Sequence, residues 1–178
     1  MKTKAVRLYG KNDLCLEEFE LPQIKDNEIL AKVVSDSLCM LSYKAACQGT
    51  DHKRVPNNVS DNPTIIGHEF AGELVAVGSK WAHKFKIGDK FSIQPALNYQ
   101  DGPVGVLSAP GYSYQFIGGD ATYVIIPNEV MENDCLLVYK GEGFFPASLA
   151  EPLSIGDSDQ YLPGGIRESP AQGFRFGG

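Results

Sequence analysis

Residues 67–78 read GHEFAGELVAVG, and this stretch places an imidazole and a carboxylate side by side between a glycine and a strand-like run. Adjacent residues on a regular strand face opposite sides, whereas on a bent loop they can converge on one point. Gly67 is suited to supply that bend, because glycine adopts backbone conformations that other residues avoid. The stretch therefore predicts a loop carrying His68 and Glu69 that runs directly into a strand over 70–77.

On either side of this stretch, short runs rich in branched or apolar residues alternate with glycine, proline, asparagine and aspartate. Such runs predict strands over 4–8, 14–21, 28–34, 70–77, 91–94, 121–126 and 135–139. Helical spacing predicts a short helix over 40–48, and the segment after Pro146 predicts another over 147–151. Several strands with only small helices favour a mainly β barrel or sandwich over an alternating βαβ sheet.

Two segments have no sustained periodic pattern. Residues 95–119 are rich in proline and glycine and predict a long loop, a type of segment that is often functional in compact domains. Residues 155–178 are again rich in glycine and proline, and we expect this atypical tail to be loosely ordered. The chain has 178 residues, and domains typically have roughly 100 to 200, so we expect one domain over 1–154.

Composition narrows the class of protein and its partners. Hydrophobic residues make up 43% and charged residues 21% of the chain, a balance typical of folded soluble proteins. The formal net charge of −6 argues against nucleic acid and anionic membranes as partners. No apolar run has the length of a signal peptide core or a membrane span, so we expect a cytoplasmic protein.

The four cysteines, Cys15, Cys39, Cys47 and Cys135, have no paired C-x-x-C spacing, which in a cytoplasmic chain indicates reduced thiols. Cys15 and Cys135 lie in apolar, strand-like contexts, where we expect small buried thiols. Taken alone, the pair of His68 and Glu69 is more often an ordinary hydrogen-bonded pair than a functional one. Its interpretation therefore depends on the motifs elsewhere in the chain.

Four motifs occur in order: SDSLCM at 35–40, GHE-x-x-G-x5-G at 67–78, IGD at 87–89 and AEPLS at 150–154. Together they resemble the catalytic domain of zinc-dependent medium-chain dehydrogenases. The chain is most similar to the polyol and sugar dehydrogenase branch, and within it to L-sorbose 1-phosphate reductases. The resemblance implies the GroES-like barrel of the alcohol dehydrogenase N-terminal domain, and an NAD(P)-dependent oxidoreductase that interconverts a polyol or sugar phosphate alcohol and its ketone.

The resemblance also implies one catalytic zinc ion at Cys39, His68 and Glu69, with Glu151 as a fourth ligand or as the partner of a zinc-bound water. Thiolate, imidazole and carboxylate groups are good zinc ligands, and a catalytic site keeps one position open. Zinc can then act as a Lewis acid on a carbonyl or lower the pKa of a bound alcohol. The chain has no cysteine between Cys47 and Cys135, where some family members bind a structural zinc. We therefore expect a single zinc ion.

Many members of the superfamily carry a serine or threonine two residues after the zinc cysteine, where its hydroxyl starts a proton relay. This chain has Leu41 there, and Ser42 is the candidate substitute. Farther along, His52, Lys53 and Arg54 form a small basic cluster. A solvated loop is the ordinary interpretation of this cluster, and phosphate binding by a sugar phosphate substrate is the sharper alternative.

The nicotinamide cofactor of this family binds a Rossmann domain marked by G-x-G-x-x-G. The nearest match, GEGFFP at 141–146, ends in proline and precedes AEPLS. We therefore expect the Rossmann half to be absent, so that NAD(P)H is implied by the family alone and the chain is inactive by itself. Loss of that half would expose an apolar surface and favour a homo-oligomer. Two alternatives stay open: a non-enzymatic zinc-binding or interaction module, and a cysteine hydrolase using Cys39 and His68.

Overall fold

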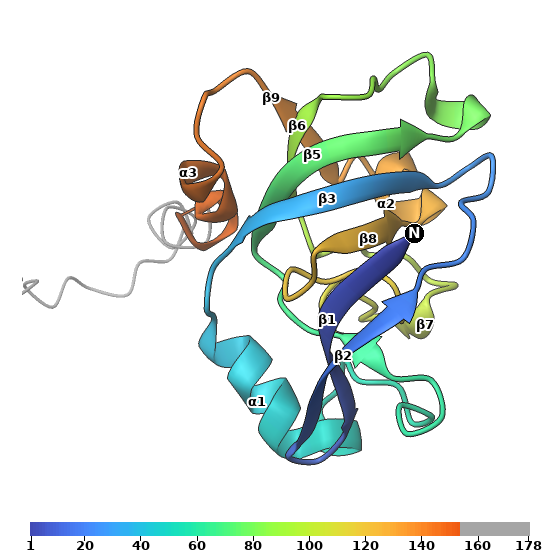
Figure 1. Ribbon diagram of the computed structural model, residues 1–178. Coiled ribbons are helices and arrows are strands. Elements are labelled where there is room, and N and C mark those ends of the chain that lie inside the picture. The colour runs from blue at the N-terminus through green and yellow to red at the C-terminus, as the bar shows by residue number, and fades with distance from the viewer. Residues whose placement is uncertain (154–178) are drawn as a thin grey trace, which may run out of the picture.

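The computed structural model describes residues 1–153, so the tail over 155–178 lies outside the described residues. The larger of two antiparallel sheets has the strand order β8-β3-β5-β6-β9 (Figure 1). Its strands are β3 (Ile29–Asp36), β5 (Phe70–Val77), β6 (Lys90–Ile93), β8 (Tyr123–Ile126) and β9 (Leu136–Tyr139). Because β3 pairs with both β5 and β8, it connects segments that are far apart in the sequence.

The smaller sheet has the order β2-β1-β4 and packs below the larger one (Figure 1). Its strands are β1 (Lys2–Gly10), β2 (Asp13–Glu20) and β4 (Thr64–Ile65). A bridge between Ala5 and Ala121 joins this sheet to the segment that leads into β8. The Val6 N–H donates to the Asp120 carbonyl at 2.8 Å, which adds to the connection between the two sheets.

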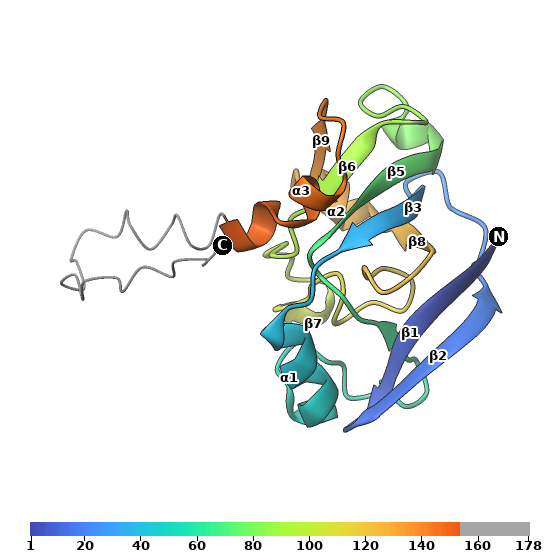
Figure 2. The same ribbon diagram turned by 60° about the vertical axis from the view of Figure 1, so that its left-hand side comes forward.

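The helices are short and lie at the margins of the sheets. They are α1 (Met40–Gln48), α2 (Asn128–Glu132) and α3 (Phe145–Ser148), with 3₁₀ turns η1 (Gly49–Asp51) and η2 (Ser79–Trp81). α1 follows directly after β3, while α3 packs against β3, β5 and β6. Figures 1 and 2 show α1 and α3 at the same edge of the molecule, beyond one end of β3.

The core lies against the larger sheet and is built from apolar side chains of strands and of the loops that cover them. Phe70 on β5 and Phe91 on β6 are fully buried and meet edge to face, with ring centroids 6.0 Å apart. Ile29 and Ile126 pair across β3 and β8 and are also fully buried. Complete burial of each such side chain contributes about 1.5–3 kcal/mol. Phe70 pairs with Asp36 at the end of β3 that leads to α1, so its burial helps to hold that strand end in place.

The fold class predicted from the sequence is confirmed: the described chain is mainly β with short helices. The predicted helix over 40–48 has the bounds of α1, whereas α3 starts at Phe145, two residues before the predicted helix, and has Pro146 in its first turn. Five elements were not predicted, namely β4, α2, the 3₁₀ turns η1 and η2, and β7 (Pro103–Val106), the last within the predicted loop over 95–119. The prediction for Cys15 was wrong, since it is exposed on β2, an edge strand of the smaller sheet, whereas Cys135 is buried.

Candidate metal centre

Cys39 lies where β3 has ended and α1 begins. It is the N-cap residue of α1, and its sulfur accepts the backbone N–H of Leu41 at 3.4 Å. Cysteine is not a preferred N-cap residue, because oxygen side chains accept this bond more strongly. The Cys39 sulfur thus lies at the start of α1, next to the end of β3, and is held there only by a weak hydrogen bond.

His68 and Glu69 lie between β4 and β5, on the bend predicted from GHE. Gly67 has a φ of +89°, and a Cβ there would lie 2.2 Å from a carboxylate oxygen of Asp36, so glycine is required on both counts. The Ser37 N–H donates to the Glu69 carbonyl at 3.0 Å, which ties the loop before Cys39 to the start of β5. The pairing of β3 with β5 therefore brings the two parts of the candidate site together.

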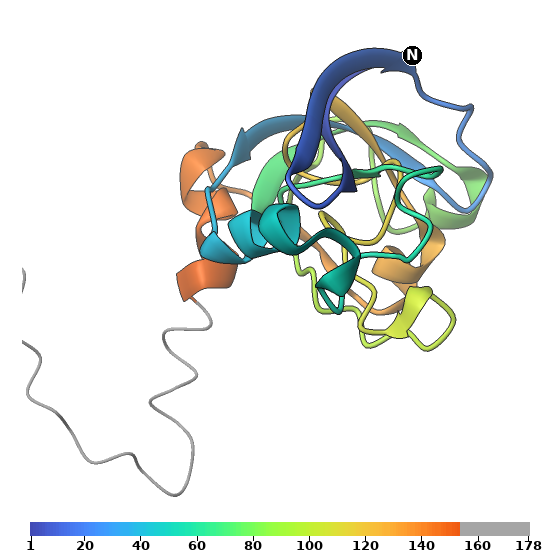
Figure 3. The ribbon, with the colours of Figure 1, turned by 90° about the horizontal axis from the view of Figure 1, so that it is seen from below.

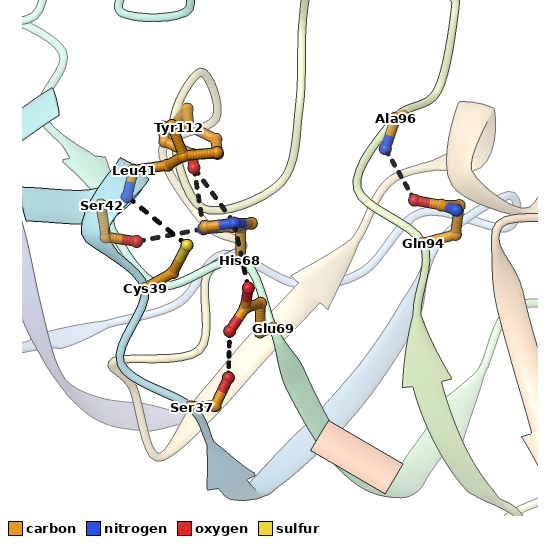
Figure 4. Close-up of polar contacts among 9 residues, drawn as sticks. All are labelled: Ser37, Cys39, Leu41, Ser42, His68, Glu69, Gln94, Ala96 and Tyr112. Atoms are coloured by element: carbon orange, nitrogen blue, oxygen red, sulfur yellow. Dashed lines mark hydrogen bonds and ion pairs between the residues drawn. The ribbon is translucent and has the colours of Figure 1, made fainter. Parts of the chain in front are cut away.

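The three side chains converge on one point (Figure 4). The ligand atoms of Cys39, His68 and Glu69 all lie within 4.8 Å of one another, as no other group of three or more such residues does in residues 1–153. His68 Nε2 is 3.7 Å from Glu69 Oε1, and the Ser37 hydroxyl donates to the other carboxylate oxygen, Oε2. His68 and Glu69 are 2% and 4% exposed, so water does not solvate them freely.

The protonation states of these residues depend on their burial. Burial lowers the pKa of His68 to about 4, against the opposing charge of Glu69, so the imidazole is neutral at pH 7. Burial also raises the pKa of the Cys39 thiol, and the nearby carboxylates of Glu69 and Glu151 act in the same direction. A neutral imidazole, a thiol and carboxylates are all groups that can coordinate a cation such as zinc.

Glu151 is placed beside this cluster by the segment that follows α3. Burial and, to a smaller extent, a side-chain hydrogen bond and charge repulsion with Glu69 together raise its pKa to about 7. The same carboxyl group acts on the thiol of Cys39. The structure thus places Glu151 next to Cys39 and Glu69, although it is not one of the three converging residues.

Ser42 has a different environment from that of a substrate relay. Its Oγ lies 3.0 Å from His68 Nδ1, and its backbone N–H donates to the Cys39 carbonyl at 3.1 Å. Leu41, at the family's relay position, is largely exposed. The Ser42 hydroxyl is therefore a hydrogen-bond partner of His68, and it does not occupy the place of the hydroxyl that family members carry at the position of Leu41.

Tyr112 also contacts the site, and sequence reasoning missed it. Its hydroxyl lies 2.9 Å from His68 Nδ1 and 3.2 Å from Nε2, and the two rings are tilted by 37° with centroids 4.7 Å apart. Burial raises the pKa of Tyr112, so its hydroxyl keeps its proton at neutral pH. Tyr112 lies in the loop over 95–119, where the only available signal was that long loops are often functional.

The three side chains of the basic cluster, His52, Lys53 and Arg54, lie in different environments. His52 is buried, stacks on Tyr112 at a centroid distance of 5.6 Å, and accepts the Arg54 N–H at Nδ1. Lys53 is exposed and, with His52, lines a surface hollow next to residues 55–58 and 103–104. The Arg54 guanidinium donates to the Leu107 carbonyl and lies 6.0 Å from the Tyr112 ring. Of the three side chains, Arg54 is the cation that lies against the Tyr112 ring and whose charge acts on His68.

This barrel, with a thiol, an imidazole and a carboxylate at one edge, has the architecture of the catalytic domain of medium-chain dehydrogenases. Residues 25–133 match the alcohol dehydrogenase GroES-like domain, and the chain belongs to this family of medium-chain alcohol and polyol dehydrogenases. In residues 1–153, no helix has both the length and the apolar character required to cross a membrane.

Two relatives are similar over most of this chain. The L-sorbose 1-phosphate reductase of Klebsiella pneumoniae is 57% identical over 152 residues, which cover 85% of this chain and 36% of the relative. The mannitol-1-phosphate 5-dehydrogenase of Aliivibrio fischeri is 46% identical over 153 residues, or 86% of this chain and 35% of the relative. The chain therefore spans about a third of the length of these relatives.

Solved structures support the fold independently of close sequence similarity. The 2R,3R-butanediol dehydrogenase of Bacillus subtilis superposes with a TM-score of 0.67 at 24% identity, over 84% of this chain and 44% of that chain. A cobalt- and zinc-bound thermostable alcohol dehydrogenase of Pyrobaculum aerophilum gives a TM-score of 0.65 at 21% identity, over 85% of this chain and 45% of that chain. At these identities the likeness establishes the fold alone.

Proposed function

We propose that this chain is the zinc-binding catalytic domain of an NAD(P)-dependent oxidoreductase that interconverts a polyol or sugar phosphate alcohol and its ketone. The observation that carries the proposal is the convergence of Cys39, His68 and Glu69 within 4.8 Å. This donor set fits zinc, because the ion binds sulfur, nitrogen and oxygen ligands at one centre. The relatives named for sorbose 1-phosphate and mannitol-1-phosphate support a phosphorylated substrate.

In this proposal Cys39, His68 and Glu69 hold the metal, with Glu151 beside them. Bound zinc supplies a Lewis acid for the carbonyl or alcohol oxygen of the substrate. The neutral imidazole of His68 is ready to coordinate without first losing a proton. Ser37 fixes one oxygen of the Glu69 carboxylate, so that the other oxygen faces His68.

Differential alkylation of the cysteines tests this proposal against the hydrolase alternative. We expect zinc to slow the reaction of Cys39 with iodoacetamide at least about tenfold, because a coordinated thiolate is no longer free to attack, and a chelator to reverse the effect. Mass spectrometry of the digested chain measures each site. Exposed Cys15 is the internal control, and its labelling should not respond to zinc. Labelling of Cys39 that is unchanged by zinc would contradict ligation and favour a free thiol.

The finer part of the proposal is that Arg54 binds the phosphate of the substrate. Its guanidinium lies against Tyr112, which contacts His68, and its charge also acts on His68. Arginine forms charge-assisted, often bidentate, hydrogen bonds with phosphate. The net charge of −6 provides no general attraction for an anionic substrate, so a local cation is needed.

We expect Arg54→Gln to weaken binding of a ketose phosphate to the zinc-loaded chain by about tenfold, a loss of about 1.4 kcal/mol. Binding of the unphosphorylated ketose should change by less than about twofold, because a charged hydrogen bond to phosphate contributes about 1.5–3 kcal/mol that the neutral sugar cannot gain. Calorimetric titration measures both. Lys53→Gln serves as the matched control, since Lys53 is exposed. Equal losses for the two sugars would refute this role.

A further inference from the structure

The imidazole of His68 is surrounded by polar partners that the proposed reaction does not use. Ser42 Oγ approaches Nδ1 at 3.0 Å, and the Tyr112 hydroxyl approaches the same nitrogen at 2.9 Å. Nε2 is the nitrogen that lies 3.7 Å from Glu69 Oε1. The Tyr112 hydroxyl also lies 3.2 Å from Nε2, so both hydroxyls are closest to Nδ1, while Nε2 is the nitrogen that faces Glu69 (Figure 4).

We propose that Ser42 and Tyr112 are positioning residues that hold His68 with Nε2 directed at the metal and Nδ1 in the hydrogen-bonded position. This inference rests on the proposed zinc site. A metal-ligating histidine usually donates its second N–H to a fixed oxygen, which sets its tautomer and ring orientation. The Ser42 and Tyr112 hydroxyls are available for that role because each can accept a hydrogen bond.

Both hydroxyls are held in place by the same elements that build the site. Ser42 lies in the first turn of α1, where its N–H donates to the carbonyl of Cys39, so one helical turn presents both a ligand and a partner of a ligand. Figure 3 shows this helix from below, next to the loops that cover the smaller sheet. The first turn of α1 therefore fixes the position of the Ser42 hydroxyl relative to the Cys39 sulfur.

Tyr112 is held in place by the aromatic rings and the loop around it. Tyr112 is 2% exposed, and its ring packs against the rings of His52 and His68 at centroid distances of 5.6 Å and 4.7 Å. The preceding Gly111 packs so closely that a Cβ there would lie 2.1 Å from the carbonyl oxygen of Gly67. The loop over 95–119 is thus pressed against the GHE bend itself, and it delivers Tyr112 to His68.

In this interpretation Ser42 has a role other than that of the relay residue, whose position is taken by Leu41. The neighbouring Ser42 does not reproduce a relay residue, because its hydroxyl is engaged with an imidazole nitrogen. Removal of either hydroxyl would leave Nδ1 with one partner, and removal of both would leave a buried nitrogen without these partners. A buried imidazole without such partners can turn about its side-chain bond or take the other tautomer, which would misdirect Nε2.

Zinc affinity of the chain, measured by competition with a chromophoric chelator, tests the inference. We expect Ser42→Ala and Tyr112→Phe each to weaken zinc binding about three- to tenfold, and the double variant about 10- to 100-fold. Tyr114→Phe is the matched control, because Tyr114 lies on the same loop but has no hydrogen bond to His68, and its affinity should change by less than about twofold. Ser42→Thr keeps the hydroxyl and should restore the affinity that Ser42→Ala loses.

Cobalt substitution supplies a readout that a purely structural role would not change. The visible ligand-field spectrum of the cobalt-loaded double variant should differ from that of the unmodified chain, whereas Tyr114→Phe should not alter it. Equal affinity and an identical spectrum in the double variant would overturn the positioning role while leaving the zinc site intact. Failure of the unmodified chain to bind zinc would instead contradict the proposed function. If Tyr112→Phe does not fold, the comparison of Ser42→Ala with Ser42→Thr decides the outcome.

Discussion

Replacement of His68 by alanine is expected to abolish stoichiometric zinc binding. The unmodified chain should contain about one equivalent of zinc, and His68→Ala should bind the ion at least roughly 100-fold more weakly, beyond the 10- to 100-fold typical of losing a partner of a ligand. The physical reason is that only two of the three converging donors remain, in a buried site where water cannot freely replace the imidazole. Elemental analysis after gel filtration measures the metal content.

The matched control for this variant is His83→Ala. His83 is exposed and stacks on Trp81 at a centroid distance of 6.0 Å, so its loss should leave the zinc content unchanged. Circular dichroism of both variants checks that the β fold is retained. Wild-type zinc content in a folded His68→Ala protein would show that the site is wrongly assigned.

The second large effect concerns catalysis by the chain alone. We expect the zinc-loaded chain to show no measurable oxidation of NADH or NADPH in the presence of ketose phosphates. Hydride transfer needs the nicotinamide ring held near the substrate carbon, and orientation of this kind supplies roughly 7 to 11 kcal/mol of barrier reduction. This chain spans about a third of the length of its relatives, and its sequence contains no G-x-G-x-x-G.

The assay follows the absorbance of the reduced cofactor over time, with a full-length dehydrogenase of the same family as the positive control. Zinc-dependent oxidation at about 1 per second or faster, an ordinary enzymatic rate, would contradict the prediction. Such a result would mean that the chain, or an assembly of several copies, builds a cofactor site by other means. If the chain is the zinc-binding catalytic domain alone, it should bind zinc and show no turnover.

The strands and the metal centre were predictable to different degrees. Strands such as β5 were found because β-branched and apolar residues form a run bounded by glycines, which is a local signal. β4 has two residues, too short for any periodic pattern, and it forms only because β1 supplies a partner. α2 starts after Pro127 and has five residues, again below the length at which helical spacing can be read.

Within the site, Cys39, His68, Glu69, Glu151 and Ser42 were singled out by motif, but Tyr112 and Ser37 were not. Tyr112 follows His68 by 44 residues and lies in a segment without periodicity, so only tertiary structure brings it to the ring. The basic cluster shows that neighbours in sequence need not share an environment. His52, Lys53 and Arg54 are adjacent in sequence, yet their side chains are respectively buried, exposed and half-buried. Sequence adjacency on an irregular segment does not determine side-chain direction.

The pairing of β3 with β5 has a consequence for how metal binding and folding are linked. Asp36 pairs with Phe70, and this long-range contact brings the segment carrying Cys39 next to Glu69. An unfolded chain lacks that contact, so it should hold zinc weakly, and the ion then acts as a ligand of the native state alone. A free zinc concentration of 100 times the dissociation constant would add about 2.7 kcal/mol to the free energy of unfolding. Because long-range pairing forms slowly relative to local helices, the metal centre would be completed late in folding, and zinc would retard unfolding more than it accelerates refolding.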